Sequence, residues 1–269
     1  MDVFNEAGLP KGVINMITGD PEMITNIALE NFNLSGIHFT GSTHVFKEIW
    51  SKVGANISKY KDYPRIVGET GGKDFIVSHP SADSLVVSTA IVRGAFEYQG
   101  QKCSAASRVY IPASKSIQIF ENLKNQVSTI KMGSPIDFEN FMTAVIHQRS
   151  YNKIVSYIEK AKNDEDSKIL IGGDYDDSKG YFISATIIIT TNPKCATMTK
   201  EIFGPVVTIY VYPDHEWKKT LQLVDQTSDY ALTGAFISNE KETIDYALKH
   251  LRYSAGNFYI NDKPSGAVV

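Results

Sequence analysis

The sequence predicts an α/β fold in which mostly parallel strands are divided between two sheets. Short runs of β-branched and other apolar residues alternate along the chain with segments that carry helical spacing. Strands separated by helices need crossover connections, and such connections favour parallel pairing. A chain of 269 residues with 42% hydrophobic residues can bury one large core or two ordinary ones.

The first 68 residues are predicted to form consecutive strand–helix units. Residues 1–7 have the pattern of the last turns of a helix, which Gly8 and Pro10 close. Apolar runs predict strands at residues 12–18, 36–40 and 65–68, and helical spacing predicts helices at 21–31 and 43–54.

The remainder of the chain repeats this alternation without a repeat of fixed period, which argues against a solenoid. Helices are expected at residues 83–98, 114–131, 147–163, 218–227 and 241–253. Strands are expected at residues 74–78, 108–111, 168–171, 181–190, 206–212, 231–238 and 257–261.

Composition narrows the classes of function. A net charge of −3 from 27 basic and 30 acidic residues gives no electrostatic footprint for nucleic acid or an anionic membrane. The longest apolar runs fall far short of the ~20 residues that a spanning helix needs, and no signal-peptide pattern opens the sequence. Two cysteines cannot form a disulfide framework, and no cluster has metal-ligand spacing. We therefore expect a soluble protein of a reducing, intracellular compartment with a small-molecule partner.

Residues 68–73 (GETGGK) form a Gly-rich turn after a predicted strand. The turn is one residue too short for a phosphate-binding P-loop, and Asp74 stands where that loop needs Ser or Thr. What remains is Glu69 in a tight turn whose glycines allow close approach of other groups. From these residues alone, Glu69 is either a surface residue of a β-turn or part of a site.

Cys103 lies in a Gly-rich loop between a predicted helix and a predicted strand. Its neighbours Lys102 and Ser104 give it a polar, partly open setting in which a thiolate is favoured. Cys195 also has a Lys beside it but no comparable Gly-rich approach, so we expect a structural role for it. The six histidines are scattered, and none shares a motif with Cys103, which makes a Cys–His hydrolase an unfavoured alternative.

Four motifs occur in a fixed order: residues 39–43 (FTGST), 69–73 (ETGGK), 100–104 (GQKCS) and 200–205 (KEIFGP). In this order and spacing they resemble the aldehyde dehydrogenase superfamily. The resemblance implies an aldehyde dehydrogenase-like fold, with a partial Rossmann-like cofactor domain and an α/β catalytic domain whose sheet is mostly parallel. It also implies NAD as cofactor.

Within the superfamily, residues 63–75, 100–108 and 256–263 resemble the 1-pyrroline-5-carboxylate dehydrogenase family. That resemblance implies oxidation of L-glutamate γ-semialdehyde to L-glutamate in proline catabolism, through a thiohemiacetal and a thioester on Cys103. It implies a homo-oligomeric parent enzyme, in the cytoplasm if bacterial or the mitochondrial matrix if eukaryotic. Against this family both ends look truncated: residues 1–68 correspond to the end of the NAD-binding domain, 69–256 to the catalytic thiol domain, and 257–269 to the start of a return toward the oligomerisation segment.

The resemblance also assigns roles to single residues. It makes Cys103 the nucleophile and Glu69 the base that activates the hydrolytic water. The residues it places at the cofactor are Thr40, Gly41, Ser42, Thr43, Gly71, Glu201 and Phe203. The residues proposed to contact substrate are Lys102, Ser104, Gly266 and Ala267.

Two other classes of function stay open at this point. The chain could be an inactive fragment that serves as a folding or subunit-binding module. It could also be a thiol esterase that needs no NAD, because Cys103 and Glu69 alone could hydrolyse activated esters.

Overall fold

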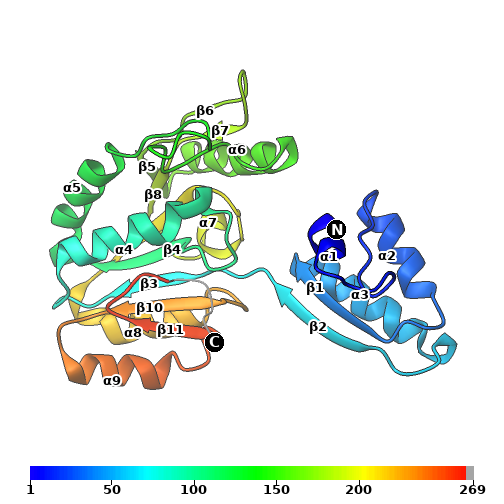
Figure 1. Ribbon diagram of the computed structural model, residues 1–269. Coiled ribbons are helices and arrows are strands. Elements are labelled where there is room, and N and C mark those ends of the chain that lie inside the picture. The colour runs from blue at the N-terminus through cyan, green and yellow to red at the C-terminus, as the bar shows by residue number, and fades with distance from the viewer. Residues whose placement is uncertain (265–269) are drawn as a thin grey trace. The chain divides into compact units, whose positions relative to one another are not determined.

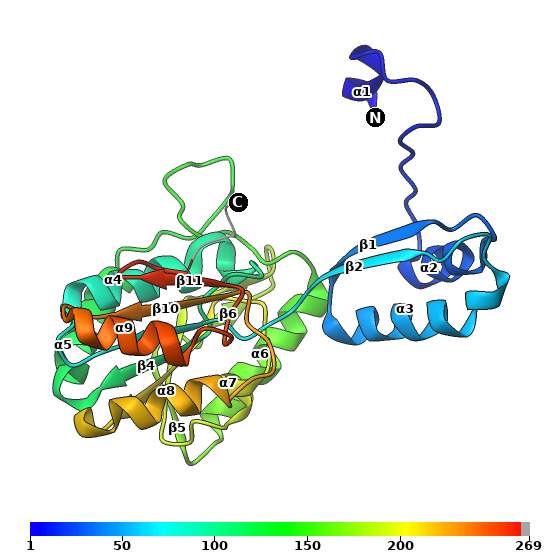
Figure 2. The ribbon, with the colours of Figure 1, turned by 90° about the horizontal axis from the view of Figure 1, so that it is seen from below.

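A computed structural model describes residues 1–264, and they divide into two compact units with the boundary after Thr70. The first unit contains α1 (Asp2–Glu6), α2 (Pro21–Glu30), β1 (Gly36–Gly41), α3 (Thr43–Ala55) and β2 (Arg65–Thr70). Strands β1 and β2 pair in parallel, from Gly36 opposite Arg65 to Gly41 opposite Thr70. This unit is drawn in blue to cyan in Figures 1 and 2.

Local sequence explains where the helices of the first unit begin. The Asp20 side chain accepts a hydrogen bond from the Met23 N–H and Pro21 occupies the first turn, so α2 starts there. Ser42 caps α3 in the same way through the Val45 N–H. A small core of Leu29, Ile49, Val53 and Tyr60 holds the helices against the two strands.

The strand expected at residues 12–18 is wrong. The structure has turns and irregular backbone there, and Val13, Ile14, Met16 and Ile17 are exposed. A β-branched run favours extended backbone, but a strand also needs a neighbour to accept its hydrogen bonds. The β1–β2 pair of this unit does not supply that neighbour.

The second unit is built on a seven-stranded sheet with the strand order β11-β10-β3-β4-β9-β8-β5. All neighbours pair in parallel except β5 with β8. The expectation of an α/β fold with mostly parallel strands in separate sheets is confirmed. The strands of the main sheet are β3 (Phe75–Ser78), β4 (Arg108–Pro112), β5 (Ser167–Ile171), β8 (Thr186–Thr190), β9 (Val206–Tyr212), β10 (Thr233–Ile237) and β11 (Asn257–Ile260).

One expected extended segment divides into two strands. Residues 181–190 contain β7 (Phe182–Ile183), which pairs with β6 (Tyr175–Asp176) in a hairpin outside the main sheet, and then β8. The Ser184 N–H donates to the Asp174 carbonyl at 3.0 Å, which extends this hairpin by one residue, and β8 begins two residues later.

Helices cover both faces of the main sheet (Figures 1 and 2). On one face lie α4 (Ser84–Phe96) and α5 (Ser116–Val127), and on the other α8 (Trp217–Asp225) and α9 (Lys241–His250). Successive side chains of β3 point to opposite faces, so Ile76 packs under α4 and α5, whereas Phe75 and Val77 pack under α8 and α9. The helix α6 (Gln148–Lys162) packs separately over β8 and β9.

Candidate active site

Three loops of the second unit meet in one pocket. Gly72 comes from the loop before β3, Cys103 from the loop before β4, and Glu201 and Phe203 from the turn before β9. Because these strands are parallel neighbours or near neighbours, their amino ends lie at one edge of the sheet. The pocket therefore opens at the amino ends of the strands, opposite to the usual position in open α/β sheets.

The chain enters the Cys103 loop through an unusual turn, η2 (Glu97–Gly100). Tyr98, Gln99 and Gly100 all have left-handed backbone, with φ of 54°, 56° and 64°. Such conformations cost non-glycine residues of order 1 kcal/mol or more each and persist only when tertiary contacts hold them. Here the Gln99 amide donates to Thr143 and to the Ala144 carbonyl.

Gly100 also fixes the distance between the Cys103 loop and the Glu201 turn. A Cβ at this position would lie 2.3 Å from the Gly204 carbonyl oxygen and 2.9 Å from that of Ala95. The two loops therefore approach closely only because residue 100 has no side chain. Cys103, three residues after Gly100, is itself exposed.

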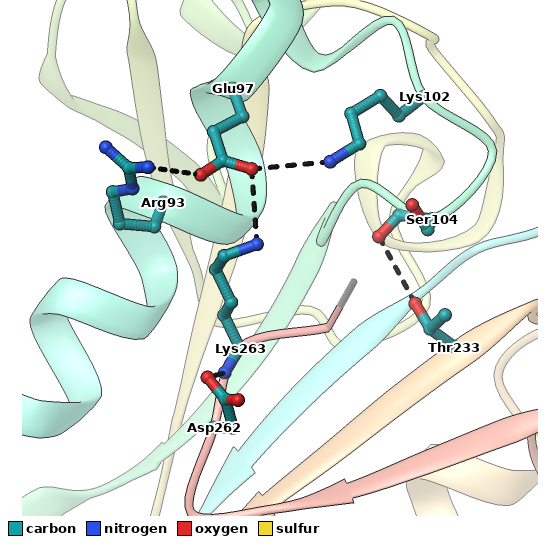
Figure 3. A network of polar contacts seen from close by, with 7 residues as sticks. All are labelled: Arg93, Glu97, Lys102, Ser104, Thr233, Asp262 and Lys263. Atoms are coloured by element: carbon teal, nitrogen blue, oxygen red, sulfur yellow. Dashed lines mark hydrogen bonds and ion pairs between the residues drawn. The ribbon is translucent and has the colours of Figure 1, made fainter. Parts of the chain in front are cut away.

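Hydrogen bonds hold the far end of the same loop. The Asp74 carbonyl accepts from the N–H groups of Ser107 and Arg108 at 3.1 and 3.2 Å. The Asp74 carboxylate, 1% exposed, accepts from the Leu232 N–H and from both the N–H and the hydroxyl of Thr233. That hydroxyl also lies 3.2 Å from the Ser104 carbonyl (Figure 3). Burial raises the pKa of Asp74 to about 7, although these hydrogen bonds oppose the shift.

A buried cation supports the base of the loop. Arg108 is 1% exposed and donates from Nε to the Lys73 carbonyl and from Nη1 to the Val224 carbonyl, each at 2.8 Å. Lys73 is equally buried, and its Nζ has no hydrogen-bond partner among the described residues. Burial and then the charge of Arg108 lower the pKa of Lys73 to about 7. The Arg108 guanidinium thus joins the start of β4 to the residues just before β3.

Glu201 packs directly on the Gly-rich turn. A Cβ on Gly71 would lie 2.1 Å from the Glu201 Oε2 atom, and the Gly72 N–H donates to Oε1 at 3.4 Å. Burial raises the pKa of Glu201, with the Gly72 N–H and two lysines opposing the shift. Beside it, Phe203 is 40% exposed and has left-handed backbone, with φ of 62°.

These features fit the nicotinamide riboside half of NAD. A carboxylate can accept hydrogen bonds from ribose hydroxyls, and an exposed aromatic ring can pack against the nicotinamide. By the family resemblance, residues 41–43 are expected near the pyrophosphate, and they lie at the end of β1 and the start of α3, where helix N–H groups favour anions.

The structure places the sequence-predicted residues in three groups. Lys102, Cys103, Glu201 and Phe203 line the pocket of the second unit. Glu69 and residues 40–43 belong to the first unit, so the approach of Glu69 to Cys103 and the contact of residues 40–43 with the cofactor stay predictions. Gly266 and Ala267 lie outside the described residues.

Two predicted substrate contacts have other surroundings in the structure. Ser104 is 2% exposed. The Lys102 ammonium lies 3.3 Å from a Glu97 carboxylate oxygen (Figure 3). Their contacts with substrate stay predictions.

Sequence reasoning missed the residues that hold the loops: Glu97, Asp74, Arg108 and Thr233. For Asp74, Arg108 and Thr233 the available signal was a charged or hydroxyl side chain at the start of an apolar strand, where burial demands a partner. Glu97 follows a helix and gave no such signal.

Comparisons with known proteins show the family of the chain. The family model described as "Aldehyde dehydrogenase family" matches residues 1–269. The chain belongs to the aldehyde dehydrogenase family. A curated relative, "Delta-1-pyrroline-5-carboxylate dehydrogenase, mitochondrial" from Dictyostelium discoideum, is 51% identical over 98% of this chain and 48% of its own length. The human relative of the same name is 45% identical over 99% of this chain and 48% of its own length.

Solved structures give the same result. The Delta-pyrroline-5-carboxylate dehydrogenase from Mycobacterium tuberculosis bound with NAD matches with a TM-score of 0.93 and 46% identity, over 100% of this chain and 49% of that one. A 1-pyrroline-5-carboxylate dehydrogenase from Thermus with bound NAD matches with a TM-score of 0.90 and 31% identity, over 100% of this chain and 50% of that one. The predicted family and fold are confirmed, and this aldehyde dehydrogenase chain spans about half the length of the relatives it matches.

No helix among residues 1–264 combines the length and apolarity needed to cross a bilayer. In the same residues, no group of three or more His, Cys, Asp and Glu side chains is arranged to hold a metal ion.

Proposed function

We propose that the protein containing this chain oxidises L-glutamate γ-semialdehyde to L-glutamate with NAD, as the names of its relatives suggest. One observation supports this most directly. The exposed Cys103 shares a pocket with Glu201 and Phe203, which have the chemistry to hold a nicotinamide riboside.

The proposed reaction begins at Cys103. Its thiolate adds to the aldehyde carbon and forms a thiohemiacetal, and the Cys103 N–H can donate to the new oxyanion. When bound, NAD supplies the acceptor for the hydride that leaves this carbon. The turn η2 and the Asp74 contacts hold the backbone at both ends of the Cys103 loop, which supports a role for this loop in positioning the nucleophile.

The resulting thioester must then be hydrolysed. We assign Glu69 as the base that takes a proton from water, so that hydroxide attacks the thioester and the Cys103 thiolate leaves. Glu69 lies in the last residues of β2, just before the turn to Gly71. The assignment rests on the family resemblance of residues 69–73.

The partner, the oligomeric state and the compartment are proposed only in general terms. The partner is a small-molecule aldehyde, and a homo-oligomeric parent enzyme is proposed from the resemblance. Relatives named mitochondrial come from eukaryotes, so the mitochondrial matrix is the compartment proposed if the source is eukaryotic, and the cytoplasm if it is bacterial.

NADH absorbance with glutamate γ-semialdehyde tests the proposal. Cys103→Ala should abolish NADH formation, whereas Cys195→Ser, a matched thiol substitution away from the pocket, should retain it. Glu69→Gln should slow deacylation more than hydride transfer, which leaves a first-turnover burst of NADH and a thioester on Cys103 that mass spectrometry detects.

Undiminished turnover in Cys103→Ala would contradict the mechanism. Cleavage of a p-nitrophenyl ester without NAD, and no NADH formation, would favour the esterase alternative. The absence of both NADH formation and ester cleavage would favour the interpretation of the chain as a folding or subunit-binding module.

A further inference from the structure

A single carboxylate at the end of α4 contacts three cations (Figure 3). Glu97 Oε1 lies 2.7 Å from Arg93, and its Oε2 lies 3.3 Å from the Lys102 Nζ and 3.2 Å from the Lys263 Nζ. We call these four residues the Glu97 cluster. The side chains of Glu97, Lys102 and Lys263 are 20 to 30% exposed, whereas that of Arg93 is 52% exposed.

The three cations belong to different parts of the chain. Arg93 is one turn earlier on α4. Lys102 directly precedes Cys103, and Lys263 follows β11, three positions before Gly266. Glu97 therefore joins the Cys103 loop to the segment that precedes Gly266 and Ala267, two of the predicted substrate contacts.

Gly94, on the same turn of α4, independently brings the same two segments together. A Cβ on Gly94 would lie 3.3 Å from the Ala106 Cβ and 3.4 Å from the Pro264 Cδ. The Ala106 N–H also donates to the Gly94 carbonyl at 3.0 Å. The end of α4 is thus a common support for the Cys103 loop and for residues 263–264.

We propose that Glu97 is a positioning residue, which holds the Cys103 loop and the segment after β11 in register through Lys102 and Lys263. This inference rests on the proposed function for its catalytic consequence. Both ammonium groups share the Oε2 atom, so they lie close together and repel each other once the carboxylate charge is removed. Because the pairs are partly buried, this repulsion is screened less than at an open surface.

Glu97 is expected to be ionised in this setting. Its burial acts to raise the pKa, but the hydrogen bond and charge of Lys263, with Arg93 and Lys102, lower the pKa below its usual value.

Hydrogen exchange measured by mass spectrometry on the whole protein tests the proposal without requiring activity. In Glu97→Gln, peptides covering residues 101–107 and 257–264 should exchange about five- to tenfold faster, because partly buried charge pairs are lost and the lysines repel. Lys263→Met should have a smaller effect, and the double variant Glu97→Gln with Lys263→Met should exchange more slowly than Glu97→Gln. Lys263→Arg should stay within about twofold of wild type, because it keeps the charge.

Arg93→Met is the matched control. It removes the shortest contact to the same carboxylate, but Arg93 lies on α4 only four residues before Glu97, so neither peptide should change by more than about twofold. If Arg93→Met equals Glu97→Gln, the carboxylate stabilises the helix rather than the two segments. No change in Glu97→Gln, or a double variant worse than Glu97→Gln, would also overturn the proposal.

Kinetics then separates this inference from the proposed function. In the enzyme that contains this chain, Glu97→Gln should lower kcat/KM for the semialdehyde about tenfold and leave KM for NAD within about twofold, since the Glu201 turn is not part of the cluster. Equal losses for both substrates would overturn the positioning role. If wild type oxidises no semialdehyde, the proposed function fails, while the exchange result still decides whether Glu97 holds the two segments.

Discussion

The buried carboxylate of Asp74 allows a sharp prediction about stability. Asp74→Ala removes the acceptor for the N–H groups of Leu232 and Thr233, each bonded at 3.0 Å, and leaves the backbone unchanged. An unsatisfied buried donor costs about 1–3 kcal/mol. Because Thr233 is fully buried and Leu232 only partly, we expect the two losses together to cost about 3 kcal/mol at pH 5.

The pH dependence of this cost follows from the pKa of Asp74. Burial raises that pKa from 3.8 to about 7, so the folded state holds the proton more tightly than the unfolded state. The corresponding stability is full below pH 4 and is lost as the pH rises through 7. Each pH unit in this window is worth about 1.4 kcal/mol, so wild type loses about 3 kcal/mol relative to Asp74→Ala between pH 5 and pH 7. Lys73 is present in both proteins, and Asp74 is the smallest of the influences on its pKa, so the contribution of Lys73 largely cancels.

Urea unfolding measures the effect in the second unit. The chain has two tryptophans, Trp50 in the first unit and Trp217 in the second, so a Trp50→Phe background leaves Trp217 as the only indole reporter. Asp74→Ala should be about 3 kcal/mol less stable than its parent at pH 5 and nearly equal to it at pH 8.5. The exposed Asp229→Ala is the control, and it should change stability by less than about 0.5 kcal/mol at either pH.

Two outcomes would refute the reasoning. An equal difference at both pH values would mean that Asp74 keeps an ordinary pKa in the folded protein. A negligible difference at pH 5 would mean that the N–H groups of Leu232 and Thr233 find other acceptors.

Three glycines yield further predictions. Gly100→Ala should destabilise the second unit by about 3 kcal/mol or more in the same urea assay, because it combines left-handed backbone with a 2.3 Å approach to the Gly204 carbonyl. Gly54→Ala, at a helical position with nothing within 4 Å, should instead stabilise the first unit by about 0.5–1 kcal/mol when it is measured in a Trp217→Phe background, in which Trp50 reports that unit, and a loss of stability would contradict the helix-propensity argument. Gly71→Ala should displace Glu201 and raise KM for NAD about tenfold, as measured by NADH formation, and an unchanged KM would remove Glu201 from the cofactor site.

The sequence alone determined the alternation of strands and helices, the family and the cofactor class. These properties depend on residues that are close together in the sequence. Hydrophobic periodicity indicates which side chains face a core, and a motif such as residues 100–104 combines its reactive groups within a few positions. Cys103 could be distinguished from Cys195 in this way, because a Gly-rich polar loop differs from an ordinary turn within its immediate neighbours.

Only the tertiary structure decided which residues hold the site together. Asp74 is separated from Thr233, and Glu97 from Lys263, by more than 150 positions, so no local pattern relates them. The same reason explains why no strand forms at residues 12–18. The apolar residues there favour extended backbone, but they do not determine which strand would pair with them. A pattern in the chain specifies what a residue prefers, whereas hydrogen bonds and ion pairs depend on which distant residue the fold brings within about 3 Å.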